Sequence, residues 1–168
     1  MNVFSELLAI KRFREEQAEL AVARQRQAYA QAEELRDDAV TQLVQFQQWA
    51  QDQEQAMYQD LCSRLVRVGE IEDVMQGVAD LRQGEQDREG RVTEAAEQVS
   101  HEADILTQRR ETHREASRMV EKFIELARIH AAEQMHELER KEDQEMEEAA
   151  SVTRDHDDWR HHDEYEPS

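Results

Sequence analysis

The chain has 168 residues and a formal net charge of −19, with 36% charged residues, 5% aromatic residues, four Gly and one Pro. This composition argues against a strand-rich fold, which needs more β-branched, aromatic and turn-forming residues, and it favours long helices. A surface this acidic repels nucleic acid and anionic lipid and favours basic partners.

The first predicted element is one long helix over about residues 3–66. From Asn2 to Val66 the chain holds neither Gly nor Pro, the residues that interrupt helices most strongly. Small and apolar residues recur in a stripe, which we call the seam, in steps of mostly three or four and with polar interruptions at Lys11, Arg14, Gln25 and Gln53: Leu7, Ala18, Ala21, Ala28, Ala32, Leu35, Ala39, Leu43, Phe46, Ala50 and Met57. A soluble helix of this length needs a partner that covers its seam.

A turn is predicted at residues 67–70. Arg64 and Arg67 stand just before Gly69, and basic residues followed by Gly are typical of a helix end. The alternative turn lies at 84–90, which begins and ends with Gly. The seam spacing continues through 84–90 without a skip, which favours the first position.

The second predicted helix spans about residues 71–150. Its seam is partly polar: Ile71, Val74, Val78, Leu81, Glu85, Arg88, Val92, Ala95, Val99, Glu102, Leu106, Arg109, His113, Ala116, Val120, Phe123 and Ala127. Two long helices joined by a short turn pack antiparallel. The sequence therefore predicts an all-α fold with one domain, residues 1–154, that forms an antiparallel two-helix coiled coil. The acidic, His-containing tail at 155–168 is expected to be disordered.

Motifs for catalysis or cofactor binding are missing from the sequence. There is no Gly-rich phosphate loop and no HExxH motif, so we expect neither enzymatic activity nor a cofactor. Cys62 is the single cysteine, which rules out an intrachain disulfide and suits a reducing cytoplasm. The histidines of the tail allow a weak metal site, but a solvated tail without metal is the favoured interpretation. No secretory signal or membrane span is expected.

The stretch from Phe46 to Tyr58 places aromatic residues in a polar helix. Phe46 and Met57 fall on the seam, so we expect them to face the second helix. Trp49 stands one step before a seam position and Tyr58 one step after another, so both are predicted on the flanks. Exposed aromatic residues of this kind are typical of binding sites. The alternative is that Trp49 shields its own coiled coil.

Three segments together resemble the YscO/FliJ family of type III secretion stalk proteins, and the YscO branch in particular. They are the aromatic pair Phe46 and Trp49 with Met57 and Tyr58, the segment VMQGVADLR at 74–82, and the segment EKFIEL at 121–126. The resemblance covers about residues 1–150.

The resemblance implies a non-enzymatic stalk in the cytoplasm, peripheral to the secretion apparatus at the inner membrane. Its partners would be the hexameric export ATPase, the cytoplasmic ring of the export gate and secretion chaperones, with no nucleic acid and no direct membrane insertion. Gate-binding positions implied by the family pattern are Phe46, Trp49, Val78 and Leu81, and the flank position Tyr58 is added as a candidate. Gly77 departs from the flagellar pattern, which has an aromatic residue there. The alternative functions are a generic coiled-coil scaffold or chaperone-like adaptor, and a filament-associated rod.

Overall fold

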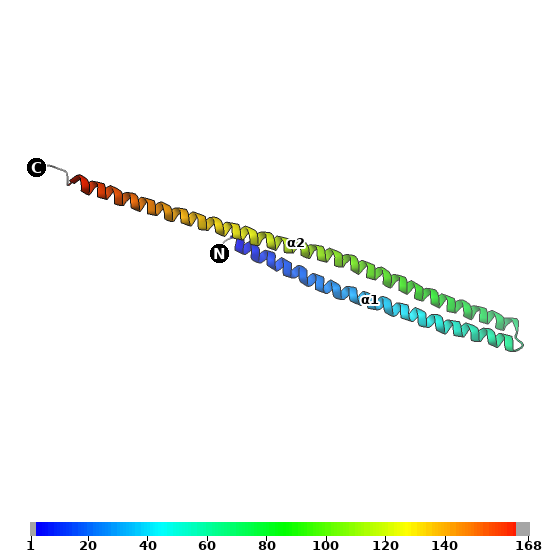
Figure 1. Ribbon diagram of the computed structural model, residues 1–168. Helices are drawn as coiled ribbons and strands as arrows, with labels where there is room; N and C mark the ends of the chain where they lie inside the picture. Colours follow the sequence, from blue (N-terminus) through cyan, green and yellow to red (C-terminus); the bar gives the residue numbers. More distant parts are fainter. Residues whose placement is uncertain (1–2, 164–168) are drawn as a thin grey trace. The chain divides into compact units, whose positions relative to one another are not determined.

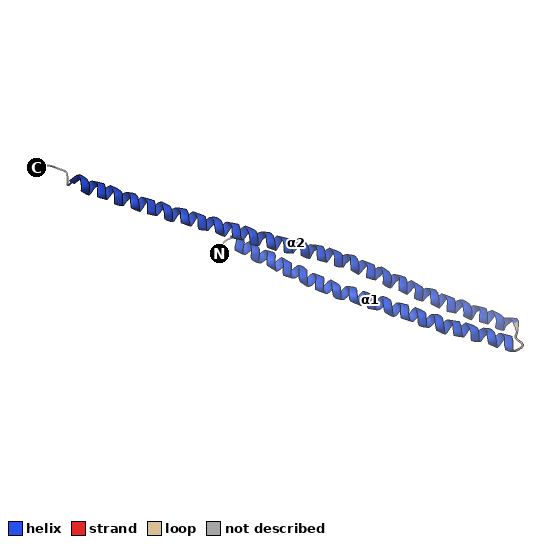
Figure 2. Cartoon of the chain, in the orientation of Figure 1, coloured by secondary structure: helices blue, strands red, loops and turns tan. Residues whose placement is uncertain are grey.

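Two helices make up nearly all of the computed structural model, which describes residues 3–163. Helix α1 runs from Val3 to Ser63 and α2 from Val68 to Asp163, with residues 64–67 between them (Figures 1 and 2). No strand occurs in the described part of the chain. The predicted all-α class with two long helices is confirmed.

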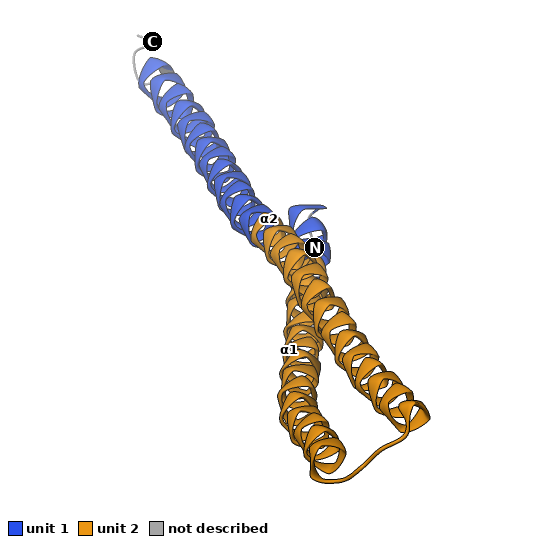
Figure 3. Ribbon diagram, turned by 90° about the vertical axis from the view of Figure 1, so that its right-hand side faces the viewer, with its two compact units in different colours: residues 1–13, 117–168 blue, residues 14–116 orange. Residues whose placement is uncertain are grey.

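The chain divides into two compact units, shown in different colours in Figure 3. Unit 1 consists of Met1–Phe13 and Ser117–Ser168, and unit 2 consists of Arg14–Ala116. Unit 2 holds the hairpin, in which α1 and α2 run antiparallel. Gln25 hydrogen-bonds to Glu102, and further along α1 Gln47 hydrogen-bonds to Glu85, so the partner number falls as the α1 number rises.

The hairpin turn lies slightly earlier than the sequence predicted. Glu70 and Arg67 cap the start of α2 reciprocally: the Glu70 backbone N–H donates to the Arg67 carbonyl at 3.0 Å, and the Arg67 N–H donates to the Glu70 carboxylate at 3.1 Å. Gly69 is therefore in the first turn of α2 and does not end α1. It has no positive φ, so the turn does not use the conformational freedom of glycine.

An ion-pair network at the turn strengthens this cap. Arg64 contacts Asp60 at 3.1 Å and Glu70 at 3.2 Å. The hydrogen bond from the Arg67 backbone, followed by that from Arg64, lowers the pKa of Glu70 below its ordinary value of 4.5. The hydrogen bonds to Asp60 and Glu70 raise the pKa of Arg64. The carboxylate of Glu70 thus links the end of α1 to the start of α2.

The seam of unit 2 buries few side chains, and most of them are small. Residues less than 9% exposed there are all apolar: Val22, Ala32, Ala50, Val78, Val99 and Leu106. Polar side chains also connect the two helices: Gln25 of α1 donates to the backbone carbonyl of Glu102 in α2 at 3.0 Å and also to the Glu102 carboxylate. A seam of this kind buries little apolar area per turn. The stability of the hairpin is therefore the sum of many small contributions along the two helices.

Four residues predicted in the seam are exposed in the structure: Arg14, Leu35, Ile71 and Arg109. Leu35 is 64% exposed because the seam steps from Ala32 to Arg36, which is half-buried, and then to Ala39. A straight α-helix has 3.6 residues per turn, so a spacing of three or four is equally possible at each step and the sequence alone does not choose between them.

Unit 1 begins with a short helix pair. The rings of Phe4 and His130 lie 4.9 Å apart, Lys11 Nζ lies 5.4 Å from the centre of the Phe123 ring, and Val120 is buried. Every residue from 131 to 162 is exposed, and α2 continues through this segment without a neighbouring helix among the described residues.

The tail differs from the prediction of disorder at 155–168. In the structure α2 continues to Asp163, and the last residues, 164–168, lie outside the described part. The stretch 151–163 contains no Gly and no Pro, so nothing in it interrupts the helix. Within residues 3–163, no helix is long and apolar enough to cross a membrane.

Candidate partner-binding surface

Phe46 lies in the seam and fits against a glycine of the opposite helix. A Cβ added to Gly84 would lie 2.7 Å from Cζ of Phe46, closer than real side chains approach. Arg88 covers the same ring, with its guanidinium carbon 3.8 Å from the ring centre, and Arg88 Nη1 donates to the Gly84 carbonyl at 3.1 Å. The predicted seam position of Phe46 is confirmed by these contacts.

Trp49 stands beside this cluster and is 51% exposed. Its ring centre lies 5.6 Å from that of Phe46, with an interplanar angle of 46°. Trp49, Phe46 and Arg88, together with Gln42 and Gln45, line a cleft of about 300 Å³. An apolar ring, a cation and two amides are therefore presented together on one flank of unit 2.

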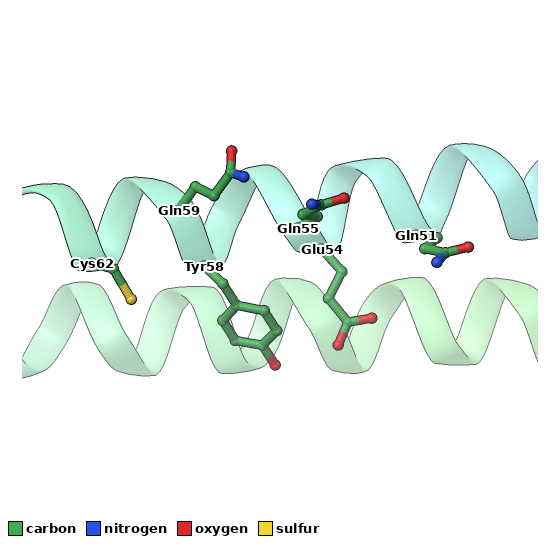
Figure 4. Close-up of a pocket in the computed structure, with 6 residues that line it drawn as sticks. All are labelled: Gln51, Glu54, Gln55, Tyr58, Gln59 and Cys62. Atoms are coloured by element: carbon green, nitrogen blue, oxygen red, sulfur yellow. The ribbon is translucent and has the colours of Figure 1, made fainter.

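Tyr58 belongs to a different groove on the other flank of α1. The groove has a volume of about 560 Å³ and is lined by Gln51, Glu54, Gln55, Tyr58, Gln59 and Cys62, all drawn in Figure 4. Tyr58 is 46% exposed, and Glu54 pairs with Arg82 of α2 at 3.6 Å. The flank positions predicted for Trp49 and Tyr58 are confirmed, but the two side chains do not share one surface.

Val78 and Leu81 face the seam. Val78 is 5% exposed and Leu81 is half-buried. Met57, predicted in the seam, is also half-buried, and a Cβ on Gly77 would lie 3.4 Å from its Cε. A partner that binds the two packed helices can therefore contact Trp49 and Tyr58 but not Val78. The five predicted binding residues are not brought together in one site.

A sequence profile for the type III secretion protein YscO matches residues 4–152. The chain belongs to the YscO family. It is also similar to the crystal structure of the type III secretion protein YscO from Vibrio parahaemolyticus, with 28% sequence identity and a TM-score of 0.81. That similarity covers 86% of this chain and 91% of the Vibrio protein. A comparison with curated proteins finds no significant match.

The sequence pattern marks Gly84 only as one end of an alternative turn and Arg88 only as a polar seam position, and it does not reveal their contacts with Phe46 in this YscO-family chain. A signal was present: Gly77 and Gly84 are seven residues apart, which is one full heptad repeat, and both lie opposite large α1 side chains. Small residues at such spacing allow close approach of a ring or thioether from the partner helix.

Within residues 3–163, no group of three or more His, Cys, Asp or Glu side chains is placed to hold a metal ion. Cys62 is exposed at the Tyr58 groove. The clefts around Trp49 and Tyr58 in this YscO-family member are open flanks of the hairpin.

Proposed function

We propose that this YscO-family chain is a non-enzymatic stalk component of the type III secretion apparatus, which links the hexameric export ATPase to the cytoplasmic ring of the export gate. It would act in the cytoplasm, peripherally at the inner membrane. The observation that carries this proposal is the presence of exposed apolar side chains in each of the two units, on surfaces that residues 3–163 leave uncovered.

The exposed apolar side chains of unit 2 are proposed to bind the export gate. Trp49 and Tyr58 are about half exposed, and Leu65 and Val68 at the turn are 101% and 72% exposed. Large aromatic side chains that remain accessible are the type that contributes most to protein interfaces. The Phe46 ring packs against the Trp49 ring. Val78 is covered by α1 and is not part of the proposed contact.

The surface in unit 1 is proposed to bind the ATPase. The helical segment 131–162 carries 11 Asp and Glu against 4 Lys and Arg, so it favours a basic partner. Apolar side chains stand among these charges at 56–73% exposure: Met135, Leu138, Met146, Val152 and Trp159. A helical segment with exposed apolar residues, and with no neighbouring helix among residues 3–163, is suited to docking in a groove or pore of another protein.

Capture by the purified export ATPase tests this assignment. Immobilised ATPase hexamer should retain the full-length chain, and Leu138→Ala with Trp159→Ala should weaken retention. The matched control is Trp49→Ala with Tyr58→Ala, which changes unit 2 only and should leave retention unchanged. Equal binding by all three proteins would contradict the assignment of segment 131–162.

Secretion chaperones are proposed as additional partners, through the groove around Tyr58. Its mixture of amides, one carboxylate and one aromatic ring suits a polar, transient interface. Tyr58→Ala should weaken chaperone capture while Trp49→Ala should not. A generic scaffold or chaperone-like adaptor would also use this groove, but it would show no binding to the export ATPase.

A further inference from the structure

A cleft in unit 2 gathers positive charge in an otherwise acidic protein. It has a volume of about 310 Å³, and it is lined on α1 by Glu19, Val22 and Arg26 and on α2 by Arg110, His113 and Arg114, among others. The stretch 109–114 of α2 holds three Arg and one Glu, whereas the whole chain carries 40 Asp and Glu against 21 Lys and Arg. The local charge is therefore opposite in sign to that of the chain.

Two arginines of this cleft have no partner within the described part of the chain. Arg26 and Arg110 make no hydrogen bond or ion pair there. Arg114 contacts Glu111 at 3.4 Å, but both side chains are at least half exposed, so that pair is weak. Arginines from two helices thus line one cleft in a protein whose carboxylates outnumber its basic groups about twofold, so the cleft is complementary in charge to an external anion.

We propose that this cleft binds an acidic segment of a partner protein through the carboxylates of that segment. The planar guanidinium of Arg matches a carboxylate with two parallel hydrogen bonds, and Arg26 and Arg110 approach from opposite helices. Val22, only 8% exposed, gives the cleft an apolar floor for the methylene groups of a Glu side chain.

Features of the same cleft disfavour other anions. Its positive groups are side chains in mid-helix, and no helix N-terminus offers the backbone N–H groups that commonly hold phosphate. The net charge of −19 repels a long polyanion such as nucleic acid or a membrane surface. A short carboxylate-bearing segment fits these limits and does not depend on the stalk proposal.

Fluorescence anisotropy with the full-length chain tests the proposal without any secretion component. The probe is a short labelled peptide of repeated Glu-Glu-Ala triplets, and a Gln-Gln-Ala peptide is its neutral counterpart. The expected result is salt-sensitive binding of the Glu peptide only, with Arg26→Gln plus Arg110→Gln raising Kd about fivefold or more, as loss of two surface ion pairs predicts.

The matched control is Arg24→Gln plus Arg109→Gln. Both residues are exposed, and they lie on α1 and α2 outside the lining of the cleft. Their substitution changes the net charge by the same amount as Arg26→Gln plus Arg110→Gln. This variant should bind the Glu peptide within about twofold of the unchanged chain, since exposed charges away from the contact are largely screened. If both double variants lost the same affinity for the Glu peptide, binding would depend only on the net charge of the chain, and the proposed site would be wrong.

Two other outcomes would also overturn the proposal. Displacement of the Glu peptide by equimolar inorganic phosphate would assign the cleft to phosphate. Salt-sensitive self-association of the chain in sedimentation equilibrium, lost with Arg26→Gln plus Arg110→Gln, would assign it to the acidic segment of a second copy. Unchanged circular dichroism of all variants establishes that the helices remain folded.

Discussion

The ring of Phe46 fills the space that a side chain at position 84 would occupy. A Cβ on Gly84 would meet Cζ at 2.7 Å and Cε1 at 3.3 Å, and the ring is held from another side by Arg88 at 3.8 Å. At this point of the seam, the large Phe46 side chain of α1 packs into the space that Gly84 leaves open on α2.

Gly84→Ala should destabilise the hairpin, whereas Gly90→Ala should not. Alanine gains about 1 kcal/mol of helix propensity at either position. At Gly90 nothing lies within 4 Å of the added Cβ, so the gain is retained. At Gly84 the Phe46 ring must shift and lose its stacking with Arg88, at a cost of about 1–3 kcal/mol. In urea denaturation the free energy of unfolding of Gly84→Ala should be lower than that of Gly90→Ala by about 1–3 kcal/mol.

The combination of Phe46→Leu with Gly84→Ala provides the control for this mechanism. Leucine removes the ring atoms that meet the added Cβ, so the double variant should be more stable than the sum of the single effects predicts. Additive free energies of unfolding would show that Gly84 matters for a reason other than contact with Phe46.

Trp49→Ala should weaken gate binding and leave the free energy of unfolding within about 1 kcal/mol of the original, because the side chain is about half exposed. Phe46→Ala should cost more stability, about 2 kcal/mol, because it empties part of the seam. Binding is measured with the purified cytoplasmic domain of the gate, and stability by urea denaturation. A large stability loss for Trp49→Ala with unchanged binding would make it a packing residue only.

Glu70 should make the hairpin turn sensitive to acid. Its pKa is lowered in the folded state, first by the Arg67 backbone N–H and then by Arg64, so its stabilisation is present above its ordinary pKa of 4.5. The stabilisation is lost as pH falls from 4.5 through the lower folded pKa. Glu70→Gln should therefore be less stable than the original chain at neutral pH, and this difference should disappear at a pH below the folded pKa of Glu70, where its carboxylate is protonated.

Glu72→Gln is the matched control for the acid effect. Glu72 is exposed and lies two residues away, and it makes no hydrogen bond or ion pair within residues 3–163. Its substitution should give the same stability difference at both pH values. If Glu70→Gln behaves in the same way as Glu72→Gln, the reciprocal cap does not stabilise the turn.

Gly69→Ala should be neutral or slightly stabilising, although the sequence suggests a turn glycine at this position. Gly69 has no positive φ, and nothing lies within 4 Å of an added Cβ. Replacement should therefore change the free energy of unfolding by between 0 and about 1 kcal/mol in the stabilising direction. A clear loss of stability would mean that the chain reverses at Gly69 after all.

The helices were predictable because their determinants are local and repeated. The absence of Gly and Pro from Asn2 to Val66 predicts a first helix without a break. The unbroken seam spacing through 84–90 predicts that the second helix continues across its two Gly residues. The turn was placed late because Gly69 was treated as a helix end, while the deciding interaction is the reciprocal bond of Arg67 and Glu70. Side-chain capping of this kind does not depend on glycine and leaves a weaker pattern.

The candidate sites were only partly predictable, because they depend on pairs of residues from both helices. The flank positions of Trp49 and Tyr58 follow from the seam spacing along α1 alone. The fit of Phe46 to Gly84 requires the register between the helices, which the sequence pattern leaves open by a residue or two. The same holds for the basic cleft, because Arg26 and Arg110 line one cleft only in the particular alignment of the two helices.

A bridging experiment tests the central claim most directly. The cytoplasmic domain of the export gate is immobilised and offered the export ATPase with and without the chain. The account predicts that the ATPase is retained only when the chain is present, and that Trp49→Ala with Tyr58→Ala abolishes this retention while the variant still binds the ATPase alone. Retention of the ATPase without the chain, or no retention with it, would contradict the linking role.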